Sequence, residues 1–289
     1  MKTTATSHPD SFRAWASSIE ASQFPSREEA RRLLWALGPA VLLLAVCLLA
    51  TGPLPQPESY HHFHDGRTLL GLPNALNVLS NLPFAIVGMH GLRWLCVSGD
   101  VMPAHLKRCY GVLLAGIALT GAGSAFYHWS PASESLVWDR LPMAVAFMGL
   151  LAGFLTERLR LQPATSGWLL GTLVAYGLAS VVYWSAFDDL RLYAVAQFYP
   201  IGLIPIVLWL TPARFTRDCD WLAAIGIYVV AKLLEELDGS IFAAAGLVSG
   251  HTLKHLAAAA GAWWLYRMLL RRQPHEAECG VTVHPAPGS

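Results

Sequence analysis

The stretch GHTLKHLAAAAGAWWLYRMLL, residues 250–270, decides the class of fold to which this chain belongs. After its second histidine it is apolar apart from Arg267, and the whole stretch is about as long as a helix that crosses a membrane. His251 and His255 are four positions apart, so a helix places both on one face near its start. The stretch therefore predicts a membrane helix that carries two imidazoles at one end.

Composition extends this prediction to the whole chain. The 289 residues are 54% hydrophobic and 13% charged, with a mean hydropathy of +0.43. A soluble domain of this size would carry about twice that charged fraction. Long apolar runs recur along nearly the whole sequence, which predicts an all-α, polytopic membrane helix bundle. The net charge of +1 says nothing about nucleic acid, and since no basic block suggests one, no nucleic-acid partner is expected. The scattered cysteines predict free thiols.

Eight spans are expected. They cover residues 33–52, 74–97, 109–128, 137–156, 167–185, 191–211, 221–237 and 251–270. The first is interpreted as an extra N-terminal helix that follows a cytoplasmic tail, residues 1–32, and residues 60–272 as a seven-span domain. A disordered tail is expected over 273–289.

The basic residues predict the orientation of these spans. With eight spans, one side of the membrane holds nearly all of them: Lys2, Arg13, Arg27, Arg31, Arg32, Lys107, Arg108, Arg158, Arg160, Arg214, Arg217, Arg271 and Arg272. The loops on the other side hold only Arg67 and Arg191, with Arg140 at the edge of a span. Both termini are therefore expected in the cytoplasm, and the host membrane is expected to be the inner or plasma membrane of a bacterium.

Polar residues gather at the outer ends of three spans. Ser124 and His128 end the third span, Asp139 lies just inside the fourth, and His251 and His255 open the eighth. Ionisable groups at such depths are costly and usually functional. Three imidazoles suit zinc, and they leave one coordination position for water. A single histidine at such a place is more often interfacial or helix-bridging, but the whole set favours a metal site.

Four motifs of this sequence resemble the alkaline ceramidase family. They are LPNALNVLSNLPF (72–84), GAGSAFYH (121–128), WDRLPM (138–143) and HTLKH (251–255), and the resemblance covers about residues 60–270. That family belongs to a wider superfamily of seven-span proteins proposed to be metal hydrolases, which includes the adiponectin-receptor-like proteins. The family cleaves the amide of ceramide and releases sphingosine and a fatty acid.

The resemblance implies roles for the clustered residues. It implies zinc held by His128, His251 and His255, with Ser124 and Asp139 beside the water that attacks the lipid amide. Asp139 is the expected proton acceptor, and Ser124 is expected to bond the water or the developing oxyanion. The substrate is expected to enter from the bilayer.

Eukaryotic members of the family also bind calcium at an acidic site, for which this sequence offers little. In YHHFHDGRTLLGLPN (60–74) the only carboxylate is Asp65, and Asn74 stands where an acid aligns. A calcium ion is therefore doubtful. The histidines of this loop (His61, His62 and His64) allow a second metal, although solvated side chains are the more common outcome.

Two further interpretations stay open. One is a metal-stabilised receptor-like or structural membrane protein with little hydrolase activity. The other is a transporter, which is less favoured because the polar groups lie at one end of the spans and form no path across the membrane.

Asp238, at the outer end of the seventh span, either orients a histidine or is solvated. The sequence does not define the substrate-binding residues or the acyl-chain preference.

Overall fold

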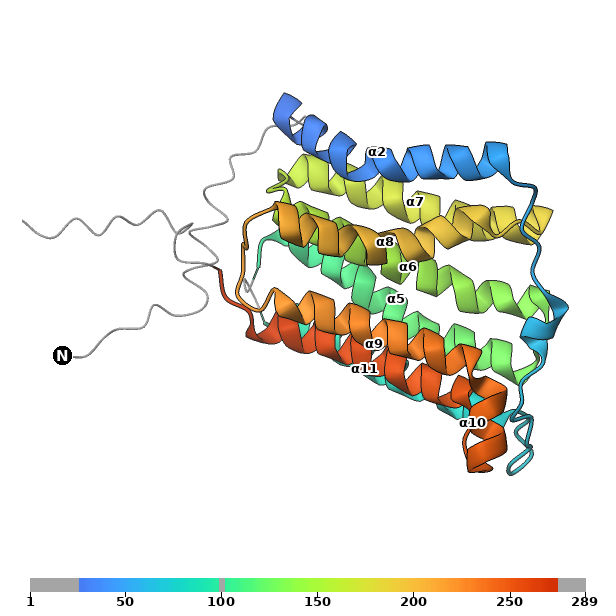
Figure 1. Ribbon diagram of the computed structural model, residues 1–289. Helices are drawn as coiled ribbons and strands as arrows, with labels where there is room; N and C mark the ends of the chain where they lie inside the picture. Colours follow the sequence, from blue (N-terminus) through green and yellow to red (C-terminus); the bar gives the residue numbers. More distant parts are fainter. Residues whose placement is uncertain (1–25, 99–101, 275–289) are drawn as a thin grey trace, which may run out of the picture.

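The computed structural model describes residues 26–98 and 102–274, and these form an all-α bundle without a β-strand. Long helices run side by side, and the short α10 crosses one end of the bundle (Figure 1). The helices are α2 (Arg27–Ala50), the 3₁₀ helix η1 (Glu58–His61), α3 (Ala75–Leu79), α4 (Leu82–Val97), α5 (Ala104–Trp129), α6 (Ser133–Arg158), α7 (Pro163–Phe187), α8 (Arg191–Leu210), α9 (Cys219–Glu236), α10 (Asp238–Ala245) and α11 (Gly250–Arg271). The all-α bundle predicted from the sequence is confirmed.

Six of the described helical segments are long and apolar enough to cross a membrane. They are Arg27–Ala50, Ala75–Val97, Ala104–Trp129, Ser133–Arg158, Pro163–Phe187 and Arg191–Leu210. The last two of the eight predicted spans are present as α9 and α11, which lie against each other and along the bundle (Figure 1), but neither is among those six. In α9 the reason is its charge, because Asp220, Lys232, Glu235 and Glu236 interrupt the apolar run.

The first span begins earlier than the predicted residue 33. Ser26 caps α2: its hydroxyl accepts a hydrogen bond from the Glu29 N–H, and the Glu29 carboxylate accepts one from the Ser26 N–H. This reciprocal capping box satisfies backbone donors that a helix start otherwise leaves unpaired. Residues 26–32, predicted as the end of a polar tail, are therefore mostly the first turns of the helix. The rest of that tail, residues 1–25, and nearly all of the predicted C-terminal tail lie outside the described residues.

Glycines allow the central helices to approach closely. A Cβ on Gly121 would lie 2.7 Å from the backbone nitrogen of Ala85 on α4, and one on Gly123 would lie 2.0 Å from the Trp138 carbonyl on α6. Small residues at crossing points let membrane helices pack backbone to backbone. Because both glycines are within two turns of His128, the same packing places the end of α5 between α4 and the start of α6.

The chain bends between α3 and α4, next to the N-terminal end of α11. Asn81 turns its amide back to the Asn77 carbonyl at 2.7 Å, and Pro83 stands in the first turn of α4. Proline lacks the N–H that would continue the hydrogen bonding of α3, so a new helix begins here. Asn77 also accepts a hydrogen bond from the Thr252 hydroxyl at 2.7 Å, which ties α3 to α11.

Candidate metal centre

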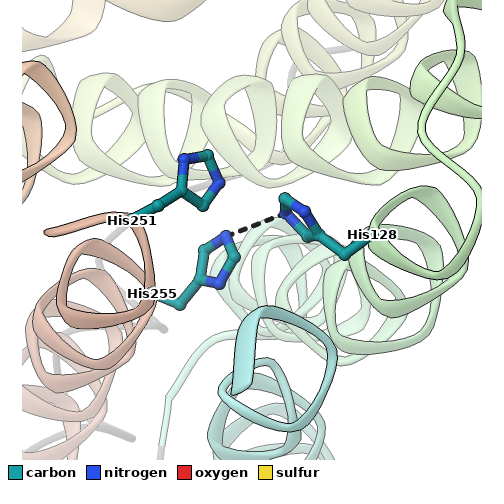
Figure 2. Close-up of side chains that lie close together, drawn as sticks. All are labelled: His128, His251 and His255. Atoms are coloured by element: carbon teal, nitrogen blue, oxygen red, sulfur yellow. Dashed lines mark hydrogen bonds between the residues drawn. The ribbon is translucent and has the colours of Figure 1, made fainter. Parts of the chain in front are cut away.

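Three histidines from two helices meet inside the bundle (Figure 2). His128 lies in the last turn of α5, and His251 and His255 lie on one face of the first turns of α11. All three are buried, and each offers a nitrogen within 4.8 Å of the nitrogens of the other two. Nε2 of His128 is 3.1 Å from Nε2 of His255. This group is the one predicted from the sequence.

The spacing of these nitrogens fits a metal ion. Two imidazole nitrogens bound to zinc in tetrahedral geometry lie about 3.3 Å apart, which follows from Zn–N bonds of about 2.0–2.1 Å. The Nε2 atoms of His128 and His255 lie close to that separation, at 3.1 Å. The Nδ1 of His255 is 2.8 Å from the Ser80 hydroxyl, and such a hydrogen bond on the outer nitrogen orients a metal-binding imidazole. The group can hold a metal ion, and the residues themselves do not identify which metal.

The start of α11 is fixed by its neighbours. Ser249 caps the helix by accepting a hydrogen bond from the Thr252 N–H. A Cβ on Gly250 would lie 2.2 Å from the Leu234 carbonyl, so only glycine permits this approach to α9. The N–H of His251 donates to Asp238 Oδ1 at 2.7 Å. These contacts set the position of both histidines of α11.

Asp238 therefore holds His251 by its backbone rather than by its ring. The second carboxylate oxygen of Asp238 lies 3.0 Å from Nδ1 of His64 and accepts from the N–H of the same residue. The sequence left open whether Asp238 orients a histidine or is solvated. Because Asp238 is only 8% exposed and bonds the backbone of His251, the structure favours a role in positioning that histidine.

Ser124 and Asp139 lie together beside the histidines. Ser124 is one turn before His128 on α5, and its side chain lies close to the carboxylate of Asp139 on α6. Both side chains are buried, and both line the same cavity as His255. Oδ1 of Asp139 has no hydrogen-bond partner among the described residues. Asp139 is not part of the three-histidine group, so metal coordination does not constrain the position of its carboxylate.

The loop before α3 covers the histidines. The ring of Phe63 packs on the rings of His128 and His251, with centroids 4.6 and 4.8 Å apart. His61 contacts the Tyr127 hydroxyl at 3.0 Å, and burial lowers the pKa of its imidazole. The group of three clustered ligands found in the described part of the chain includes none of the loop histidines. Phe63 covers two of the clustered histidines, and His61 lies beside it against Tyr127.

The carboxylate of Asp65 in the same loop is bound by Arg67. Nε of Arg67 lies 2.7 Å from one oxygen and Nη2 lies 2.8 Å from the other, and these hydrogen bonds lower the pKa of Asp65. The same guanidinium donates to the carbonyls of Gly246 and Leu247 after α10. The ion pair thus fastens the loop to the end of α10.

A charged network at the site was not predicted in full. Within α9 the structure shows Lys232 paired with Glu235. It adds Lys254, whose Nζ lies 2.6 Å from Glu235 and 3.3 Å from Nε2 of His251. A metal ion on that nitrogen would displace the contact with Lys254. The lysine inside HTLKH was the available signal, since it is a charge in the first turns of a largely apolar helix.

An apolar cavity of about 360 Å³ begins at these polar residues. Ser124, Asp139, Glu235, Lys254 and His255 line one end of it. Its other walls are mainly aliphatic and aromatic, from α5, α6, α8, α9 and α11, and include Leu113, Ile117, Phe147, Leu150, Ile201, Ile204, Trp221, Ile225, Ala258, Ala262 and Leu265. From Glu235 to Trp221 the lining follows α9 for about 21 Å, at 1.5 Å per residue. The cavity therefore suits a long alkyl chain with a polar group at the histidine end.

The fold and the site together define a membrane protein of the all-α class with a candidate metal centre of three histidines. Comparison of the chain with models of known protein families found no match, and comparison with curated proteins found none either.

Proposed function

We propose that this protein is a zinc-dependent hydrolase that cleaves the amide bond of ceramide or a related N-acyl lipid. The products are a free fatty acid and a long-chain amine. The observation that carries the proposal is the joining of two features in one place: a three-histidine group, and an apolar cavity that ends on Ser124 and Asp139. The sequence motifs that resemble alkaline ceramidases support the same reaction.

The residues present divide the chemistry among them. Zinc held by His128, His251 and His255 would polarise the amide carbonyl and make water a better nucleophile at neutral pH. Asp139 accepts the proton of the attacking water and passes it to the amine as the C–N bond breaks. Ser124 donates a hydrogen bond, either to Asp139 or to the developing oxyanion. The cavity holds the acyl or amine chain, so the substrate never leaves an apolar environment.

The membrane setting belongs to this proposal. In the host, a bacterial inner membrane, the histidines lie near the outer face and both termini lie in the cytoplasm. A lipid then enters laterally from the outer leaflet and presents its amide at the level of the site. The one-sided distribution of lysine and arginine in the sequence supports this orientation.

The reaction is tested with purified protein and a panel of lipids. Ceramide, an N-acylethanolamine and a matched ester are incubated with the protein, and released fatty acid is measured by mass spectrometry. Release from an amide lipid should stop on chelation and return with zinc. If no lipid of the panel is hydrolysed by zinc-loaded protein, the alternative of a metal-stabilised receptor-like or structural protein gains.

A further inference from the structure

Arg140 is a buried cation in the wall of the cavity that the proposed reaction does not use. It directly follows Asp139 on α6, its side chain lines the cavity, and it is only 6% exposed. Its side chain turns into the protein.

Aromatic rings hold the guanidinium in place. Its carbon lies 4.0 Å from the ring centre of Trp184 and 4.9 Å from that of Tyr193, and Nη2 donates to the Gln56 side chain at 2.5 Å. Stacking of this kind offsets part of the cost of burying a cation. The rings and the amide fix the position of Arg140, but neither neutralises its charge.

The guanidinium has no ion-pair partner among the described residues. Nη1 of Arg140 has no hydrogen-bond partner, and no carboxylate of the described chain forms an ion pair with it. The two lysines of the cavity, Lys232 and Lys254, both pair with Glu235. The Asp139 carboxylate is near enough to interact with the charge of Arg140 but forms no ion pair with it. An unpaired buried charge is costly, so a ligand that supplies an anion here would be bound strongly.

We propose that Arg140 binds an anionic group on the amine part of the substrate. The favoured substrates are then N-acyl lipids with an acidic headgroup, such as N-acyl amino acids, in preference to neutral N-acyl amines. This inference rests on the proposed amide hydrolysis in the same cavity. In an N-acyl amino acid one carbon separates the carboxylate from the amide nitrogen, and Asp139 and Arg140 both line the cavity that would hold these two groups.

The test compares two lipids that differ in charge and little else. N-dodecanoylglycine ends in a carboxylate, and N-dodecanoylethanolamine ends in a hydroxyl at the same place. Binding of each to the full-length protein in detergent is measured by calorimetry, and fatty-acid release is followed in the same samples. Wild-type protein should bind the glycine lipid about tenfold more tightly, the equivalent of about 1.4 kcal/mol. Equal affinities would overturn the inference.

Three variants assign that preference to a residue. Arg140→Gln removes the charge and should bring the two affinities within about twofold, whereas Arg140→Lys keeps the charge and should retain part of the preference. Arg217→Gln, just before the start of α9 and outside the lining of the cavity, is the matched control and should keep the full preference. A full preference in Arg140→Gln would overturn the inference. If that variant fails to fold, the wild-type preference and the partial loss in Arg140→Lys still decide.

Two further arms separate this inference from its alternatives. Dodecanoate, the released acid, should bind wild type and Arg140→Gln with equal affinity. If Arg140→Gln loses as much affinity for dodecanoate as for N-dodecanoylglycine, Arg140 binds the carboxylate of the product, and the headgroup assignment is overturned. Selective binding without fatty-acid release would contradict the proposed hydrolysis and leave the anion site supported. Hydrolysis of both lipids without selective binding would contradict the anion site and leave the hydrolysis supported.

Discussion

Nε2 of His128 lies 3.1 Å from Nε2 of His255, although 127 positions separate the two residues in the chain. The two nitrogens face each other because α5 ends and α11 begins at the same depth of the bundle. His251 adds a third imidazole one turn before His255. A metal ion in this group would therefore join two helices that are otherwise far apart in sequence.

Replacing Asp139 by asparagine should separate catalysis from metal binding. The variant keeps the shape and the contact with Ser124 but cannot accept a proton, so turnover should fall by about 10²-fold or more. Zinc content should stay at the wild-type level, because Asp139 lies outside the three-histidine group. Ser124→Ala should reduce turnover less, since water can replace part of one hydrogen bond. If Asp139→Asn loses its zinc, Asp139 is a ligand; if it hydrolyses lipid at the wild-type rate, Asp139 is not the base.

Gly250→Ala should damage the metal centre without touching a histidine. The added Cβ would lie 2.2 Å from the Leu234 carbonyl, so the start of α11 must move, at a cost of about 1–3 kcal/mol. We expect a lower melting temperature and weaker zinc binding. Gly226→Ala on α9 is the matched control, because nothing lies within 4 Å of its new Cβ and alanine favours a helix. Equal melting temperatures for the two variants would show that the approach at Gly250 is not tight.

Asp189 should stabilise the attachment of α2 in a pH-dependent way. It accepts hydrogen bonds from Arg191 and from the Leu54 N–H, while Arg191 donates to the Cys47 and Thr51 carbonyls at the end of α2. The bonds from Arg191 hold the pKa of Asp189 well below its usual range. A lowered pKa stabilises the fold above the unfolded value of about 3.9 and loses that effect as the pH falls further.

The check is the melting temperature of wild type and Asp189→Asn in detergent between pH 7 and pH 3. Wild type should melt roughly 2–4 °C higher at neutral pH, the shift that about 1 kcal/mol produces in a chain of this size. The difference should hold down to about pH 4 and shrink below it. A difference that grows on acidification would contradict this role of the carboxylate.

The proposed orientation predicts which cysteines an impermeant maleimide reaches in intact cells. A cysteine at the exposed position of Glu134, beside the site end of α6, should be labelled from outside. The native Cys219, exposed at the opposite end of the bundle, should react only after permeabilisation. The reverse pattern would place the histidines at the cytoplasmic face.

The sequence carried enough signal for the helices and for the three histidines. Apolar runs predicted the bundle, and the four-residue spacing of His251 and His255 predicted a shared face, because both depend on local periodicity. The start of α2 was missed because the capping box at Ser26 extends the helix into a polar segment. Local pattern could not reveal the turn of Arg140 towards Trp184, since that contact depends on tertiary packing.

Partners of the site residues were also beyond local pattern. Lys254 was visible as a charge in α11, but its contact with Glu235 requires the pairing of α9 and α11. Asp238 was placed near the site, yet its bond to the His251 N–H follows from the close approach at Gly250. Such contacts depend on how two helices are aligned side by side, which the order of residues along the chain does not reveal.

The most direct test is the zinc content of purified protein and of three single variants: His128→Ala, His251→Ala and His255→Ala. Wild type should hold about one zinc per chain, and each variant should lose most of the metal together with fatty-acid release, because each removes one of three ligands. His90→Ala is the control, since His90 is exposed on α4 and lies outside the histidine group, and it should keep both. Stoichiometric zinc in all three variants would contradict the assignment of these histidines as the metal centre.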